Sequence, residues 1–181
     1  MEITLPKKLT PILIAAGLLA LLAALAAILV PRLTGRSLAQ AVGFDSGQAA
    51  AVEGAQAFYA VDYQEAPEKW SARLCALGTK PGCTFYETLA PALWKTFITN
   101  QTVITAEVDA VRQVFDGQAP TRQDAWLQIW ELGVTLSTPW PQSTDGAADF
   151  TAYALVLHEE DGWKFERLLM DAEVERYLGG D

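Results

Sequence analysis

The sequence predicts an α+β protein in which an apolar N-terminal helix precedes a helical half and then an antiparallel sheet. Three observations predict it. Residues 9–30 form an uncharged run, residues 46–97 place apolar side chains at helical spacing, and residues 103–170 alternate apolar and polar side chains between turn signals. With 181 residues, the chain is long enough for one domain with a buried core.

The uncharged run LTPILIAAGLLALLAALAAILV covers 22 residues, 9–30. As a helix it extends roughly 33 Å, enough to cross a hydrocarbon core of about 30 Å. A cleaved signal peptide has a shorter apolar region of about 7–15 residues, and a buried helix without a polar face is unusual. We therefore expect a single-pass transmembrane helix, with residues 1–8 as a cytoplasmic tail and residues 31–45 as a linker.

The basic residues that flank this run nearly balance, because Lys7 and Lys8 precede it while Arg32 and Arg36 follow it. The positive-inside rule is therefore nearly tied. Residues 37–181 hold 9 Lys and Arg against 21 Asp and Glu. This acidic balance gives mild support to an extracytoplasmic C-terminal part, and it lacks the basic surface that nucleic-acid binding normally needs. We expect the lipid bilayer to be contacted through residues 9–30, and we expect no nucleic-acid partner.

The helical half is predicted from caps and from side-chain spacing. Residues 45–46, Asp-Ser, offer an N-cap to the Ala-rich stretch SGQAAAVEGAQAFYAVDY. Pro67 in a first turn and Gly78 after a last turn bound a second helix, PEKWSARLCALG. A third helical stretch, TFYETLAPALWKTF, follows Cys83, and we expect it to bend or break before Pro91.

The strand half reads as four strands. VITAEVDAVRQVF and AWLQIWELGVTLST alternate apolar and polar residues, whereas FTAYALVLH is apolar on both faces, as a central strand is. The turn EEDG before WKFERLLM contains Asp-Gly, a strong hairpin signal. The tail AEVERYLGGD is predicted to be a short acidic helix. We therefore expect two or three helices packed on one curved, four-stranded antiparallel sheet.

Helices followed by a twisted meander resemble the cone of the nuclear transport factor 2-like superfamily, over residues 46–178. A single anchor before such a domain is similar to the bitopic inner-membrane assembly factor of type IV secretion systems and to TcpC-type conjugative transfer proteins. The stretches AQAFYAVDY and GWKFERLL carry this likeness. The full TcpC form has two such domains, and this chain has room for one. The resemblance implies an extracytoplasmic domain, residues 46–181, that binds protein partners or forms a homo-oligomer.

The resemblance also implies an alternative function, because some cone proteins are isomerases or dehydratases with an Asp or His base and Tyr donors. The candidates here are Tyr59, Asp62 and Tyr63 as pocket residues, and His158, the single histidine. His158 precedes three carboxylates in a predicted solvated turn, and a general base needs a pocket. We therefore expect no catalytic residue. We favour a non-catalytic scaffold or assembly protein of a secretion or conjugation-like machine over a membrane-tethered small-molecule-binding or isomerase/dehydratase-like domain.

The two cysteines, Cys75 and Cys83, could form a redox pair, part of a metal site or a disulfide. They do not fit C-x-x-C, and with one histidine they give no recognisable zinc set, so we expect no metal and no cofactor. On one unbroken helix their Cα atoms would lie about 12 Å apart, beyond the roughly 7 Å limit for a disulfide. Gly78, Pro81 and Gly82 let the chain turn back. For a domain outside the membrane, a disulfide is the expected state.

Overall fold

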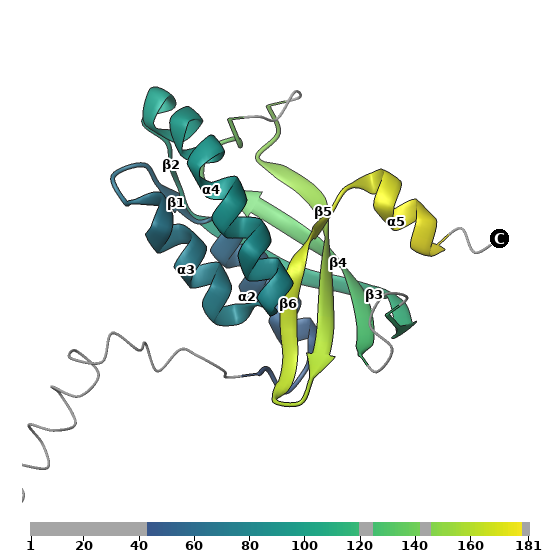
Figure 1. Ribbon diagram of the computed structural model, residues 1–181. Helices are drawn as coiled ribbons and strands as arrows, with labels where there is room; N and C mark the ends of the chain where they lie inside the picture. Colours follow the sequence, from purple (N-terminus) through teal and green to yellow (C-terminus); the bar gives the residue numbers. More distant parts are fainter. Residues whose placement is uncertain (1–42, 120–124, 142–145, 179–181) are drawn as a thin grey trace, which may run out of the picture. The chain divides into compact units, whose positions relative to one another are not determined.

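The computed structural model describes residues 43–119, 125–141 and 146–178, and the structural statements below concern these residues (Figure 1). The predicted tail, transmembrane helix and most of the linker lie outside them. Within the described ranges, no helix is both long enough and apolar enough to cross a membrane.

The described chain contains four helices and six strands, which agrees with the predicted α+β class. The helices are α2 (Gly47–Tyr59), α3 (Pro67–Leu77), α4 (Lys80–Asn100) and α5 (Asp171–Leu178). The strands are β1 (Val61–Asp62), β2 (Val103–Ile104), β3 (Ala106–Gln118), β4 (Trp126–Leu136), β5 (Asp149–Glu159) and β6 (Gly162–Leu169). The last four strands form an antiparallel meander in the order β3-β4-β5-β6, as predicted, and β1 pairs with β2 in a separate two-stranded sheet.

Local signals place the first two helices correctly. The Ser46 hydroxyl accepts a hydrogen bond from the Ala49 N–H at 3.1 Å, which caps α2. Pro67 occupies the first turn of α3, where its missing N–H is tolerated. The first helix is shorter than the predicted stretch, because the chain leaves it at Tyr59 and Val61 pairs with Ile104 across β1 and β2.

The third helix corrects the sequence prediction at both its start and its middle. α4 begins at Lys80, and Cys83 therefore lies inside it, because the Thr79 hydroxyl accepts from the Gly82 N–H at 3.1 Å and caps the helix. The helix also continues through Pro91 without a break. Proline removes one intrahelical hydrogen bond, but buried side chains follow it on the same helix, and this packing offsets the lost bond. They are Leu93, Trp94 and Phe97.

Each face of the sheet carries a buried apolar cluster. One face, here called the helical face, packs against α2, α3 and α4, and α2 contacts all four strands of the meander. The other face, here called the α5 face, carries a smaller apolar cluster that includes Val174 of α5. Figure 1 shows α2, α3 and α4 grouped together and α5 apart from them.

Small residues let α2 approach the sheet closely. Its buried positions include Ala50, Ala51, Gly54 and Ala55. A Cβ atom at Gly54 would meet the ring of Phe165 on β6 at 2.1 Å, so no larger residue fits without a shift of that ring. The small residues of α2 therefore have two effects. They favour the helical conformation, and they allow the helix to pack close to the strands.

Candidate binding surface

Aromatic rings fill the space between the helices and the helical face of the sheet. Nine buried or half-buried rings make a connected set with centroid separations of 5.0 to 6.0 Å, and they come from α2, α3, α4, β5, β6 and the segment after β4. They are Phe58, Tyr59, Trp70, Tyr86, Trp94, Phe97, Trp140, Phe150 and Phe165. A ligand pocket of a cone protein would need this space, and here it is packed core.

The three residues proposed as pocket residues lie in different settings. Tyr59 belongs to the aromatic core, where burial raises the pKa of its hydroxyl well above the ordinary value and keeps it neutral. The Asp62 carboxylate accepts a hydrogen bond from the Gln64 N–H at 2.9 Å, and the Tyr63 hydroxyl lies 3.3 Å from the Gln64 amide nitrogen. Asp62 and Tyr63 thus stabilise the turn after β1 and are not joined to Tyr59 by a hydrogen bond among the described residues.

His158, the remaining titratable candidate, lies far from those residues along the sheet. Tyr59 packs edge-on against Phe150, near the start of β5, whereas His158 lies near the end of that strand. The imidazole is exposed and makes an edge-on contact with Trp163 at 5.1 Å. The structure therefore does not bring His158 together with the tyrosines of α2.

The disulfide between Cys75 and Cys83 is present, with Cα atoms 4.4 Å apart, and it joins the end of α3 to the first turn of α4. The joint is also tied to β6, since the Thr79 N–H donates to the Phe165 carbonyl at 3.0 Å. The Thr79 hydroxyl bonds to the carboxylate of Glu166 on the same strand. The cysteines therefore fix the joint between two helices over the helical face.

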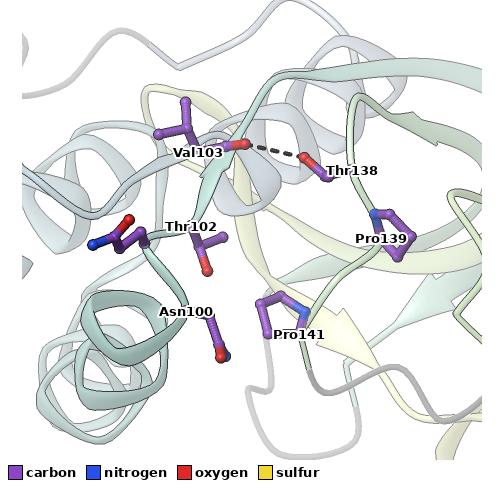
Figure 2. A pocket seen from close by; sticks show the side chains of 7 residues that line it. Asn100, Thr102, Val103, Thr138, Pro139 and Pro141 are labelled. Carbon is purple, nitrogen blue, oxygen red and sulfur yellow. Dashed lines mark hydrogen bonds between the residues drawn. The ribbon is translucent and has the colours of Figure 1, made fainter.

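An open pocket lies at one end of the domain, where α4 runs into β2 and where β4 ends. It has a volume of about 460 Å³. Figure 2 shows Asn100 and Thr102 on one side of this space and Pro139 and Pro141 on the other, with the Val103 carbonyl directed at Thr138. We call it the ladder-end pocket, lined by Asn100, Gln101, Thr102, Val103, Thr138, Pro139 and Pro141.

The helix side of the ladder-end pocket is fixed by the end of α4. Gln101 adopts a left-handed conformation with φ 49°, which stops the helix, and its N–H bonds back to the carbonyl of Ile98. The Thr102 N–H donates to the Phe97 carbonyl at 2.9 Å. The Thr102 carbonyl then accepts from the Tyr63 N–H at 2.9 Å, which starts the pairing of β2 with β1.

The other side of the pocket exists because the β3–β4 ladder stops. Ser137 donates its N–H to the Thr105 carbonyl at 2.9 Å, and its hydroxyl accepts from the Thr105 N–H at 3.0 Å. Continuing the register of Ala106 with Leu136 would place Pro139 opposite Val103, and proline has no N–H to donate.

The Val103 carbonyl accepts instead from the Thr138 hydroxyl at 3.1 Å, the bond drawn in Figure 2. The predicted strand from residue 103 to 115 is accordingly split at Thr105 into β2 and β3. Sequence reasoning missed this site, although the Pro-Trp-Pro sequence at 139–141, directly after a strand, is a signal that could have found it.

The described residues that line this pocket are uncharged, and some of them are apolar. Val103 in the lining is 53% exposed, and Ile98, in the last turn of α4 near the pocket end, is 57% exposed. The lining supplies amides from Asn100 and Gln101, hydroxyls from two threonines and the apolar rings of two prolines. These groups suit a partner that offers peptide groups and apolar side chains, and they offer no charge to attract an ion.

Together these features define an α+β domain with a packed core and an open pocket at one end. No protein-family model matches the chain. No curated protein matches it significantly. One similar solved structure is described as a periplasmic fragment of TraM, with a TM-score of 0.46, 13% identity, and coverage of 67% of this chain and 91% of the TraM chain. A TM-score below 0.5 does not establish a shared fold, and the function is therefore inferred from this chain's own residues.

Proposed function

We propose that this chain is a non-catalytic, membrane-anchored scaffold or assembly protein whose extracytoplasmic domain binds a protein partner at the ladder-end pocket. The observation that carries the proposal is the interrupted β3–β4 ladder, which leaves strand β2 beside an open, uncharged space. Val103 lines this space and is 53% exposed, and Ile98, in the last turn of α4, is a second exposed apolar side chain at this end of the domain. Apolar anchors surrounded by polar groups are the usual anatomy of a protein interface.

The partner segment that fits best is an extended peptide. The bond from Tyr63 to the Thr102 carbonyl makes residues 63 and 102 a hydrogen-bonded pair. By the alternation of antiparallel pairs, the N–H and carbonyl of Val103 point away from β1, towards the pocket. The Val103 carbonyl already accepts from the Thr138 hydroxyl, so an extended segment would bond to the Val103 N–H through its main chain and place side chains against Val103 and the prolines.

Two further observations support the membrane and extracytoplasmic parts of the proposal. Residues 9–30 are an uncharged run of 22 residues, long enough to span a bilayer. The disulfide between Cys75 and Cys83 suits an oxidising compartment. The sequence likeness to type IV secretion and conjugative transfer proteins suggests that the partner belongs to a secretion or conjugation-like machine.

Site-specific photocrosslinking of the full chain in intact cells tests this function. A photoreactive amino acid replaces Val103 or Asn100 in the pocket lining, and a matched control replaces Val111, which is 60% exposed on β3. We expect both pocket positions to give the same discrete protein adduct and Val111 to give none. The substitution Val103→Asp should remove the adduct formed from Asn100, because it buries a charge in the interface. Adducts that form equally from all positions, or a chain that stays monomeric throughout, would contradict the proposal.

A further inference from the structure

Four side chains line up in direct cross-strand register at one end of the sheet. Trp126 of β4 stands opposite His158 of β5, His158 stands opposite Trp163 of β6, and Trp163 pairs with Phe44. Directly opposed residues of antiparallel strands place their side chains on the same face. We call Phe44, Trp163, His158 and Trp126 the aromatic row.

Two members of the aromatic row pack against the core, and the other two are exposed to solvent. Phe44 and Trp163 are half-buried and pack against the core of the helical face. Trp126 is 46% exposed, and its indole N–H donates to the carboxylate of Asp116 on β3. An indole whose N–H is satisfied and whose ring remains open is suited to a surface that is apolar on one side and wet on the other.

This row marks the end of the domain where the chain enters it. Phe44 and Trp163 exchange two backbone hydrogen bonds, of 2.9 and 3.0 Å. Gly43 lies so close to the β5–β6 turn that a Cβ atom there would meet the Asp161 carbonyl at 1.8 Å. Trp126 is the first residue of β4, whereas Thr138 of the ladder-end pocket follows the last. Figure 1 shows the β5–β6 turn and the start of α2 at the end opposite to the junction of α4 and β2.

Only 12 residues, 31–42, separate the predicted anchor from Gly43. An extended chain of this length spans at most about 43 Å. With the anchor of the proposed function in place, a linker of this length allows the aromatic row to reach the membrane surface. Tryptophan is enriched in that interfacial zone of membrane proteins.

We propose that the aromatic row docks onto the surface of a neutral, zwitterionic lipid bilayer, an inference that rests on the anchor of the proposed function. A neutral surface fits better than an anionic one, because, among the described residues, Asp116, Glu159 and Asp161 lie beside the row and the cation Lys164 is paired with two of them. Docking through Trp126 and Trp163 holds this end of the domain against the lipid. The ladder-end pocket, at the opposite end, then faces away from the membrane and stays open to a partner.

Fluorescence quenching tests the docking. The full chain is reconstituted into phosphatidylcholine vesicles whose acyl chains carry bromine close to the headgroup, where it quenches tryptophan in the interfacial zone. We expect Trp126 and Trp163 to be quenched and the buried Trp70 and Trp94 to be protected. Trp126→Ser should lose most of the quenching, including that of Trp163, whereas Trp126→Phe should keep the quenching of Trp163, since phenylalanine preserves an apolar ring.

Ile98→Ser is the matched control, because it also removes an exposed apolar side chain, but at the pocket end, and it should leave the quenching unchanged. An alkaline wash of the same vesicles separates the two proposals. A chain that resists the wash but is not quenched overturns the docking and leaves the anchor standing. Release of the chain overturns the anchor and the docking with it. If quenching survives Trp126→Ser, the aromatic row is not the surface that docks onto the lipid. A dimer crosslinked through Trp126, without quenching, would likewise show that the row contacts a second copy of the chain instead of lipid.

Discussion

The two faces of the sheet are buried in different ways, although the same four strands form both. The helical face is covered by three helices and a connected set of nine aromatic rings. The α5 face is covered by one helix of eight residues over a small cluster, made of Ala119, Leu127, Ile129, Leu155, Leu157, Leu169 and Val174. The alternation of side chains along each strand allows one sheet to support a large core and a small one.

The difference predicts two levels of stability within the domain. Buried area and ring packing on the helical face should set the free energy of global unfolding. On the α5 face, Arg167 of β6 holds Glu173 of α5 through two hydrogen bonds, of 2.9 and 2.7 Å. A short helix held by few contacts opens locally at much lower cost than the whole domain.

The largest expected effect is from Phe165→Ala on the helical face. Phe165 is fully buried, stacks on Tyr86 with centroids 6.0 Å apart, and fills the space above Gly54. Removing its ring should lower the free energy of unfolding by about 3–5 kcal/mol, since the packed neighbours cannot close the cavity. Urea denaturation of the solubilised full chain measures this. Tyr177→Ala, which removes a ring contact with Phe115 on the α5 face, is the matched control and should cost much less.

The second effect tests the disulfide over the helical face. Replacing Cys75 and Cys83 together by serine should lower the free energy of unfolding by roughly 2.5 kcal/mol, since the bond closes a short loop in the unfolded chain. The urea midpoint of the variant measures the loss, and hydrogen exchange of α5 should stay unchanged. Thiol labelling of unreduced, denatured protein should find no free thiol, and two free thiols would contradict both the disulfide and an extracytoplasmic domain.

Local signals in the sequence were enough for the fold class and for several element boundaries. Ser46 and Pro67 marked the starts of α2 and α3, and Asp161-Gly162 marked the β5–β6 hairpin, where Gly162 has φ 118°. Each of these depends on neighbouring residues only.

The features that sequence reasoning missed depend on contacts between distant segments. α4 passes through Pro91 because of its buried face, and its start is fixed by the bonds of Thr79 to β6. The ladder-end pocket depends on the register that sets Pro139 opposite Val103. Tyr59 lies in the core, because its ring packs against Trp140, which follows β4, and against Phe150 of β5.

The smallest effect should appear on the α5 face as the pH falls. The hydrogen bonds from Arg167 lower the pKa of Glu173 in the folded chain, and the Met170 N–H also donates to this carboxylate at 3.0 Å. The folded pKa of Glu173 lies below the unfolded value of about 4.3. The stabilisation that the Arg167–Glu173 pair gives to the attachment of α5 is therefore complete above that pH. It is lost as the pH falls through the folded pKa, since protonation removes the charge that Arg167 binds.

Glu173→Gln should therefore weaken the attachment of α5 at neutral pH by about 1 kcal/mol or less, as partly exposed ion pairs do. Hydrogen exchange of the α5 amides measures this. Acidification should weaken the protection of these amides in the parent chain, and this additional loss of protection should be absent in the variant. Arg112→Gln, which breaks an ion pair with Glu131 on an exposed part of the sheet, is the control and should leave α5 exchange unchanged. If acid or Glu173→Gln speeds exchange on the helical face as much as in α5, the two faces unfold together and the contrast between them is wrong.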